Sequence, residues 1–335
     1  MTARDIAPIP VAMHESFQQA EKDRSRWALA AAGLSVSVAL ILIAAKLVAW
    51  IMSGSTAVLG SLADSSLDLV GSLVAFVGVR WAAEPPDAEH RFGHGKAEAV
   101  SSLTQIVLIS GSALFVAYES VRRLINPEPL ANGGVAMGAM ALSLALSIGL
   151  VAFQSLAIRK SGSLAVEGDQ AHYTGDIIAN GGTLVAVFLA VQFGWLRADA
   201  IAGLAAALFL AHAAWSIGRR ALPQLMDEEL PKTQRDRIAD IVRADEGVVD
   251  FHALRTRRAG QRSYIQMHLD LDPDLTLRAA HAITDRVELA LHEAFPGADI
   301  ILHMDPYGES EPHDKFGART DIEHPEYVEG SANIS

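Results

Sequence analysis

Six long apolar segments occupy the first two thirds of this chain, and no other feature constrains its fold as strongly. An α-helix needs roughly 20 predominantly apolar residues to cross the hydrocarbon core of a bilayer. The segments that meet this requirement are Trp27–Met52, Thr56–Trp81, Ala97–Val121, Gly133–Ile158, His172–Val191 and Asp199–Gly218. The sequence therefore predicts an α-helical membrane protein with six transmembrane helices over residues 27–220, preceded by a polar cytosolic segment over residues 1–26.

Basic residues lie unevenly on the two sides of these helices. One side carries ten Lys and Arg residues, whereas the other carries only Arg122, Arg123 and Arg197. Cytoplasmic loops of membrane proteins carry the excess of positive charge. We therefore expect a multi-pass protein of the inner (plasma) membrane with both termini in the cytoplasm. Residues 1–26 contain no short apolar core before a cleavage site, so we expect no signal peptide.

After Arg220 the pattern changes to that of a small α+β domain, which we place at residues 221–305. The expected elements are a helix over Pro231–Ala244, strands over Val248–Arg257 and Ser263–Asp270, a helix over Leu277–Ala294 and a strand over Ala298–Asp305. This αββαβ order predicts one sheet with both helices on one face. The polar residues 306–335 are rich in Gly, Pro and Glu, and we expect them to be disordered.

Charge and cysteine content narrow the possible functions. The formal net charge is −12, and most of it comes from the last third of the chain. This acidic balance argues against nucleic acid as a partner. The chain has no cysteine, so it contains neither disulfides nor thiolate metal sites. Any metal site must consist of His, Asp and Glu.

Two pairs of ionisable residues lie inside predicted transmembrane helices. Asp64 and Asp68 are four residues apart in the second helix, as are His172 and Asp176 at the start of the fifth. Residues at this spacing lie on one helix face. A lone polar residue near a helix end can snorkel toward water, but an intramembrane carboxylate costs about 2.5–3.5 kcal/mol and needs a partner. We therefore expect both pairs to bind one metal ion, with separate structural roles as the alternative.

Three carboxylates and one imidazole suit tetrahedral Zn²⁺. The same ligands admit Fe²⁺, Cd²⁺, Co²⁺ and Mn²⁺, whereas Mg²⁺ prefers oxygen ligands and keeps its waters. The ligands must lose their protons before a metal binds, and His172 is the member that titrates nearest to neutral pH. We therefore expect metal ions and protons to compete for this site.

A second group of candidate ligands lies between the second and third predicted helices. Asp87, His90 and His94 fall within eight residues, on a loop that contains Gly93 and Gly95. Such a loop could fold three side chains around one ion, or it could leave the histidines exposed to water. Spacing alone does not separate these interpretations.

Histidines also recur in the predicted cytosolic domain. Side chains alternate between the two faces of a strand, so His303 and Asp305 share one face while Leu302 and Met304 share the other. We expect the apolar face to contact the helices and His268, His303 and Asp305 to lie on the opposite face. A solvated polar face is the alternative, but histidines from several elements favour metal binding.

One string of residues carries a family resemblance. His90-Arg-Phe-Gly-His94-Gly-Lys96-Ala-Glu98, with Asp64-x3-Asp68 before it and His172-x3-Asp176 after it, resembles the cation diffusion facilitator family, most closely its bacterial zinc and ferrous-iron efflux branch. The similarity runs from about Arg26 to Asp305. It implies a homodimer with a ferredoxin-like cytosolic domain that exchanges a cytosolic divalent metal for protons by alternating access.

The resemblance also implies residue roles. It assigns the transport site to Asp64, Asp68, His172 and Asp176, and a loop metal site to Asp87, His90 and His94. In the cytosolic domain it assigns one ion to His252, His268 and Asp305, and a second to His281, His303 and Asp305, which bridges the two. It matches Lys96 and Asp227 to a structural charge pair. One departure is Ala253, where close relatives carry aspartate.

We therefore expect a metal/proton antiporter, with Zn²⁺, Fe²⁺, Cd²⁺ or Mn²⁺ as substrate and regulatory ions, and not an enzyme. The alternative is a membrane-anchored metal sensor that binds without transport. A sensor would not need ligands at mid-membrane depth, so the Asp64/Asp68 pair favours transport. An intramembrane metallo-hydrolase would need a nucleophile or base motif, which we do not find.

Lys46, in the first helix, is expected to snorkel to the outer membrane surface.

Overall fold

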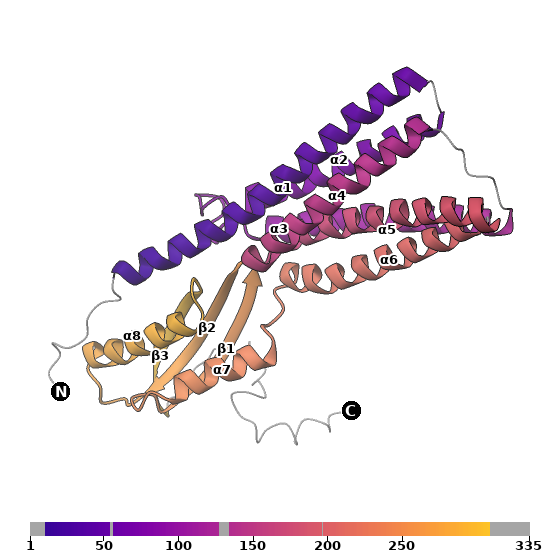
Figure 1. Ribbon diagram of the computed structural model, residues 1–335. Helices are drawn as coiled ribbons and strands as arrows, with labels where there is room; N and C mark the ends of the chain where they lie inside the picture. Colours follow the sequence, from indigo (N-terminus) through magenta and orange to yellow (C-terminus); the bar gives the residue numbers. More distant parts are fainter. Residues whose placement is uncertain (1–10, 54–55, 127–133, 196, 309–335) are drawn as a thin grey trace, which may run out of the picture. The chain divides into compact units, whose positions relative to one another are not determined.

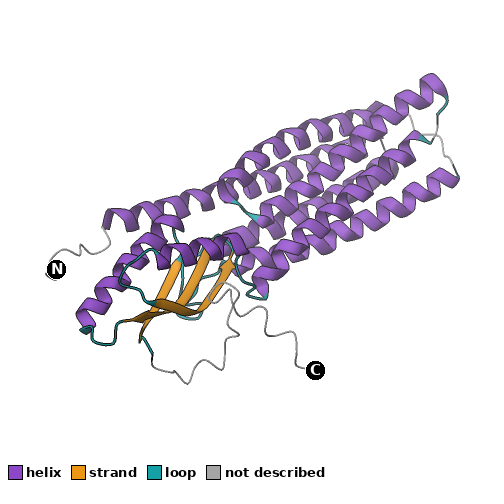
Figure 2. Cartoon of the chain, turned by 90° about the horizontal axis from the view of Figure 1, so that it is seen from below, coloured by secondary structure: helices purple, strands orange, loops and turns teal. Residues whose placement is uncertain are grey.

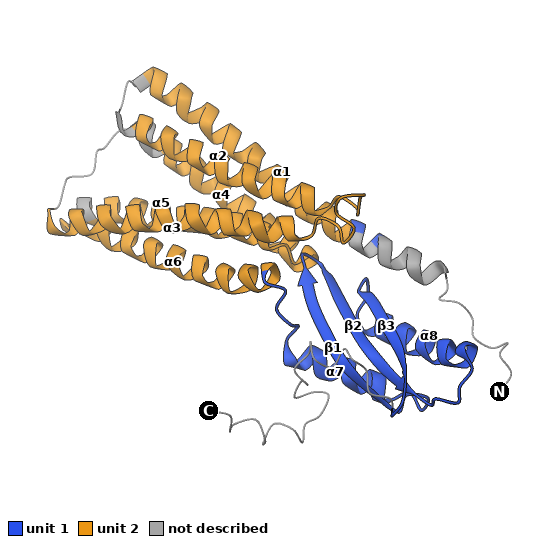
Figure 3. Cartoon of the chain, turned by 180° about the vertical axis from the view of Figure 1, so that it is seen from behind, with its two compact units in different colours: residues 1–22, 226–335 blue, residues 23–225 orange. Residues whose placement is uncertain are grey.

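The structure is a computed structural model that describes residues 11–53, 56–126, 134–195 and 197–308 (Figure 1). The chain divides into two compact units, one of residues 23–225 and one of residues 226–335 with residues 1–22 (Figure 3). Each unit is described by itself. Most of the polar C-terminal segment predicted to be disordered lies outside the described residues.

Residues 23–225 form a helical membrane unit, as the sequence predicts. Its helices are α1 (Val11–Ser53), α2 (Thr56–Ala82), α3 (Lys96–Ile125), α4 (Gly134–Ser161), α5 (Leu164–Phe193) and α6 (Ala198–Leu225). All of these except α5 meet the length and hydropathy expected of a membrane span within the described residues. Helix α5 is 30 residues long and has an apolar second half, but its first half carries Glu167, Asp169, His172 and Asp176.

Helix α5 begins eight residues earlier than predicted, at Leu164 instead of His172. The polar residues before His172 look like a connection in the sequence, but the fold supplies partners for them. Glu98 of α3 accepts a hydrogen bond from the Ser163 hydroxyl and from the backbone N–H groups of Leu164 and Ala165. A carboxylate at this position satisfies N–H groups that have no partner within the helix. Consequently His172 lies more than two turns inside α5.

Small residues let α5 and α6 pack closely. A Cβ atom added to Gly175 would lie 2.5 Å from Leu210 of α6, and one added to Gly182 would lie 2.4 Å from the Cβ of Ala202. A side chain at Gly182 would collide with the Cβ of Ala202, which cannot turn away, and one at Gly175 would require the flexible Leu210 side chain to shift. Close contact between backbones through small residues is typical of membrane helices. It fixes the face of α5 that carries His172 and Asp176.

The second unit is the predicted α+β domain (Figure 2). Its elements are α7 (Lys232–Arg243), β1 (Asp250–Ala259), β2 (Arg262–Leu271), α8 (Leu277–Ala294) and β3 (Asp299–Pro306). The strand order is β1-β2-β3, with β1 antiparallel and β3 parallel to β2. Ile265, Met267 and Leu269 of β2 are fully buried against α7 and α8. The opposite face of the sheet is therefore free to present polar side chains, as the strand alternation predicts.

A β-bulge interrupts the pairing of β1 with β2. The register shifts between His252 and Arg255, and Ala253 adopts a positive φ of 52°. An alanine in this left-handed region costs roughly 1–2 kcal/mol, whereas Asn and Asp tolerate it better. An aspartate, which the family resemblance implies at this position, would suit the bulge for this reason.

We predict that Ala253→Asn stabilises the cytosolic unit by about 0.5–1 kcal/mol, because it relieves this backbone strain. Hydrogen exchange of the β1 amides in the full-length protein measures the change. Ala253→Val is the matched control, since a β-branched residue is unfavourable at positive φ and should speed exchange. Equal exchange in both variants would contradict the strained bulge.

Candidate metal centres

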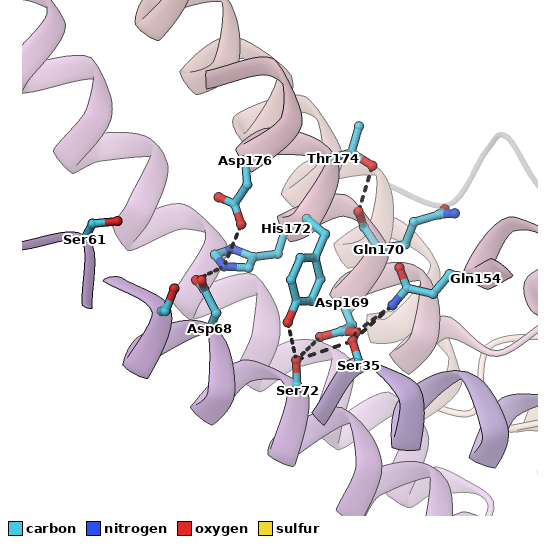
Figure 4. A network of polar contacts seen from close by, with 12 residues as sticks. Ser35, Ser61, Asp68, Ser72, Gln154, Asp169, Gln170, His172, Thr174 and Asp176 are labelled. Atoms are coloured by element: carbon cyan, nitrogen blue, oxygen red, sulfur yellow. Dashed lines mark hydrogen bonds and ion pairs between the residues drawn. The ribbon is translucent and has the colours of Figure 1, made fainter. Parts of the chain in front are cut away.

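The membrane unit brings three predicted ligands together (Figure 4). His172 Nε2 of α5 lies 2.7 Å from Asp68 Oδ1 of α2 and 3.9 Å from Asp176 Oδ2. One ligand atom from each of the three residues lies within 4.8 Å of the others. Asp68 is 5% exposed, so its carboxylate is removed from solvent. Two helices thus place one imidazole and two carboxylates around one point.

Asp64, the fourth predicted ligand, is not part of this group of three. It lies one turn before Asp68 on α2, and its residue is exposed. Its role as a ligand therefore stays a prediction that the geometry does not test.

Lys46 corrects one expectation. Its side chain does not snorkel: the residue is 6% exposed, and its Nζ donates to Ser65 Oγ at 2.6 Å and to the Ser61 carbonyl at 3.1 Å. Both acceptors flank Asp64 on α2. The ammonium group therefore places a buried positive charge beside the predicted site.

A buried polar network next to the site was also missed. Asp169 of α5 accepts hydrogen bonds from Ser35 of α1, Ser72 of α2 and Gln154 of α4. Figure 4 shows these side chains converging from four helices. The signal was present in the sequence, because Asp169 precedes His172 by three residues and shares its helix face. The predicted fifth helix begins only at His172, so Asp169 falls outside it.

The loop between α2 and α3 brings Asp87, His90 and His94 together. Asp87 Oδ1 lies 3.3 Å from His90 Nδ1, and Asp87 Oδ2 lies 3.4 Å from His94 Nε2. The backbone N–H of His90 donates to Asp87 Oδ1 at 2.6 Å. This hydrogen bond holds the pKa of Asp87 below its ordinary value, so the carboxylate is charged at neutral pH. His94 is buried, whereas the other two side chains are about half exposed.

In the cytosolic unit, three histidines form a row across the sheet. His252 of β1 pairs with His268 of β2, which pairs with His303 of β3. The ring centroids of neighbours in the row are 4.9 and 4.7 Å apart. Strand alternation predicts a shared face for His268 and His303, and only the family resemblance adds His252; the sequence does not show that the three lie directly opposite one another on neighbouring strands.

Asp305 lies at the centre of this row and is 5% exposed. Its Oδ2 is 2.7 Å from His268 Nδ1 and 3.6 Å from His252 Nε2, and its Oδ1 is 3.0 Å from His303 Nε2. His252, His268 and Asp305 form a group in which one ligand atom from each lies within 4.8 Å of the others. The two oxygens of one carboxylate thus face different histidines.

The second predicted cytosolic set does not form such a group among the described residues. His281 of α8 is largely exposed and lies 3.7 Å from Asp285 on the same helix. The predicted Lys96 and Asp227 belong to different units, so their pairing stays a prediction. Within its own unit, the Asp227 carboxylate accepts a hydrogen bond from Arg257 Nη1 at 3.2 Å.

Comparisons with known proteins point to one family for both units. Residues 33–226 match the cation efflux transmembrane domain, and residues 230–307 match the cation efflux protein cytoplasmic domain. The cation-efflux pumps FieF of Salmonella newport (strain SL254) and Salmonella heidelberg (strain SL476) are 41% identical to this chain over 282 residues, which cover 84% of this chain and 92% of each relative. A solved structure of CzrB in its zinc form is 37% identical to this chain and covers 25% of this chain and 98% of its own. Its TM-score of 0.23 is too low to support a structural comparison.

The order of the motifs, the division into two units and these matches all indicate the same family. The sequence matches span both units, and the relatives are similar over most of their own length. The chain therefore belongs to the cation diffusion facilitator family, and it is a multi-pass membrane protein of cation efflux and not an enzyme.

Proposed function

We propose that this protein exports Zn²⁺ from the cytoplasm in exchange for protons, through the site of Asp68, His172 and Asp176. The observation that carries the proposal is the convergence of these three side chains from α2 and α5 inside the membrane unit, with Asp68 buried and His172 and Asp176 partly buried. Ionisable groups inside a membrane domain are costly and mark ion pathways. We propose Asp64, one turn before Asp68, as the fourth ligand.

Ligand chemistry favours zinc. An imidazole nitrogen with carboxylate oxygens suits tetrahedral Zn²⁺, and the relatives named above are cation-efflux pumps. Fe²⁺, Cd²⁺ and Mn²⁺ are further candidate substrates, because geometry and availability decide among divalent metals.

The contact between His172 and Asp68 can couple metal binding to the release of a proton. At 2.7 Å, Nε2 and Oδ1 must share one proton, since an ionised carboxylate and an unprotonated ring nitrogen are both acceptors. When Nδ1 also carries a proton, so that His172 is an imidazolium, a metal that takes both atoms as ligands displaces the Nε2 proton from the site; a neutral ring would only move its single proton to Nδ1. The proton leaves as the metal enters, so a proton gradient can drive metal movement.

We propose further that the protein is a homodimer in the inner membrane with both termini in the cytoplasm. The row of histidines on the open face of the sheet, with Asp305, is proposed to bind regulatory metal ions. This cytosolic site alone would serve a sensor that binds without transport. Transport measurements separate the two functions.

The first test uses the purified protein in liposomes with an internal pH dye and clamped membrane potential. We expect Zn²⁺ to move against its gradient when the opposite side is acid, with protons moving the other way. One pH unit supplies about 1.4 kcal/mol per proton, which is about a tenfold metal ratio. Binding without flux would indicate a sensor, and flux indifferent to pH would indicate a uniporter.

Variants locate the site in the same assay. Asp68→Ala and His172→Ala should each abolish flux, because each removes a ligand. His212→Ala is the matched control: His212 lies in α6, is exposed, and belongs to no ligand group among the described residues. Normal flux in either site variant would contradict the assignment.

A substitution of the ligand type tests selectivity. His172→Asp leaves only oxygen ligands, which favour harder ions, so Mn²⁺ transport should rise relative to Zn²⁺. Competition between the two metals in the liposome assay measures the ratio. A ratio equal to that of the parent would show that His172 is not a ligand.

The cytosolic site is tested by Asp305→Ala. Because both Asp305 oxygens face histidines, this variant should lose all zinc bound by the cytosolic unit and should lower the transport rate without abolishing transport. Equilibrium dialysis of the full-length protein counts the ions. Asp299→Ala, at the other end of β3, is the control. An unchanged count for Asp305→Ala would contradict the bridging role.

A further inference from the structure

Asp169 is a buried carboxylate that the proposed transport site does not use. It is 3% exposed and lies on α5 one turn before His172. Ser72 Oγ donates to its Oδ1 at 3.0 Å, Gln154 Nε2 donates to its Oδ2 at 2.7 Å, and the Ser35 hydroxyl also donates to Oδ2. All three donors are neutral. A membrane-embedded carboxylate without a paired cation is costly in its charged form, so a protonated form is accessible.

This network accommodates both protonation states of Asp169. The Gln154 amide nitrogen can only donate, so Oδ2 remains an acceptor in either state. The Ser72 hydroxyl can donate or accept, and it lies 3.3 Å from the Tyr173 hydroxyl, with either atom able to be the donor. A proton on Oδ1 can therefore be donated to Ser72 Oγ, while Ser72 donates to Tyr173. Uptake or loss of the proton requires hydroxyl rotation and no movement of a helix.

A cavity connects Asp169 with the metal site. Its volume is about 230 Å³, and both Asp169 and His172 line it. Gln105 of α3 also lines it and is 2% exposed, and neither atom of its amide has a hydrogen-bond partner among the described residues. Buried polar groups generally have partners, so we expect a water at Gln105, although most of the cavity wall, which includes Leu67, Val107, Leu108 and Ile109, is apolar. Water in this cavity would give protons a route between the two residues.

Few charges surround Asp169. The neighbouring helices present Ser35 from α1, Ser72 from α2, Gln105 from α3 and Gln154 from α4, which are all neutral. The titratable groups near it are His172 and Tyr173 of its own helix. Side chains three residues apart on a helix are neighbours. A divalent ion bound at His172 would therefore be the largest charge near Asp169.

We propose that Asp169 is a second proton-binding site, which binds a proton when the transport site holds no metal and releases it to the cavity when a divalent cation binds. The positive ion destabilises the protonated, neutral acid relative to the carboxylate, because opposite charges attract across a short distance of low dielectric. This inference rests on the proposed function, since it assigns one of the protons exchanged for metal.

The test counts protons released when Zn²⁺ binds to the full-length protein in weakly buffered detergent solution. Asp169→Asn keeps a neutral polar group of the same shape but cannot titrate. It should bind Zn²⁺ and release up to about one proton fewer per ion than the parent, and Asp169→Glu should restore the release. Asp199→Asn is the control, because that carboxylate pairs with Arg123 at 3.0 Å and should not affect proton release.

The outcomes separate this inference from the proposed function. A parent that transports Zn²⁺ without moving protons overturns the antiport proposal. A parent that releases protons, with the same number released by Asp169→Asn, overturns the role of Asp169 alone. If Asp169→Asn does not fold, infrared difference spectra of the parent decide: Zn²⁺ binding should remove a protonated-carboxyl band, and a spectrum without that loss overturns the proposal.

Discussion

The hydrogen bond between His172 and Asp68 joins α5 to α2 in the membrane unit, and the arrangement around it depends on this contact. Neither residue could be buried alone, because an unpaired ionisable group in a bilayer is too costly. The network around Asp169 also joins α5 to α1, α2 and α4, and glycines on α5 let it pack closely against α6. The polar groups therefore specify how these helices pack, since apolar surfaces provide little preference between one helix arrangement and another in lipid.

The same logic explains why the interior of the unit is polar in one region. Lys46, Asp169 and Glu98 are all buried, and each has partners supplied by another helix. Together with the metal ligands they place several ionisable groups inside this unit. A protein that only anchored a sensor would have no need of such a set, and each member would be a cost without a function.

Much of this organisation follows from the sequence. Apolar length predicts the helices, strand alternation predicts the polar face of the sheet, and the i, i+4 pairs identify His172 with Asp176 and Asp68 as neighbours. What the sequence does not reveal depends on contacts distant along the chain. The start of α5 was misplaced because its cap, Glu98, comes from α3, and Lys46 was assigned to the surface because its acceptors lie on α2. Asp169 could have been found by its spacing from His172, but its donors on three other helices could not.

The row of His252, His268 and His303 depends on correct strand pairing when the cytosolic unit folds. Backbone hydrogen bonds set the spacing of the three histidines, because neighbouring strands lie about 4.8 Å apart. If either outer strand paired with β2 one residue out of register, its side chains would turn to the opposite face, and its histidine would leave the row. Under the role proposed for this face, zinc binding would thus report correct strand pairing. A chain with a misaligned edge strand would then be recognised because its cytosolic unit fails to bind metal at this face.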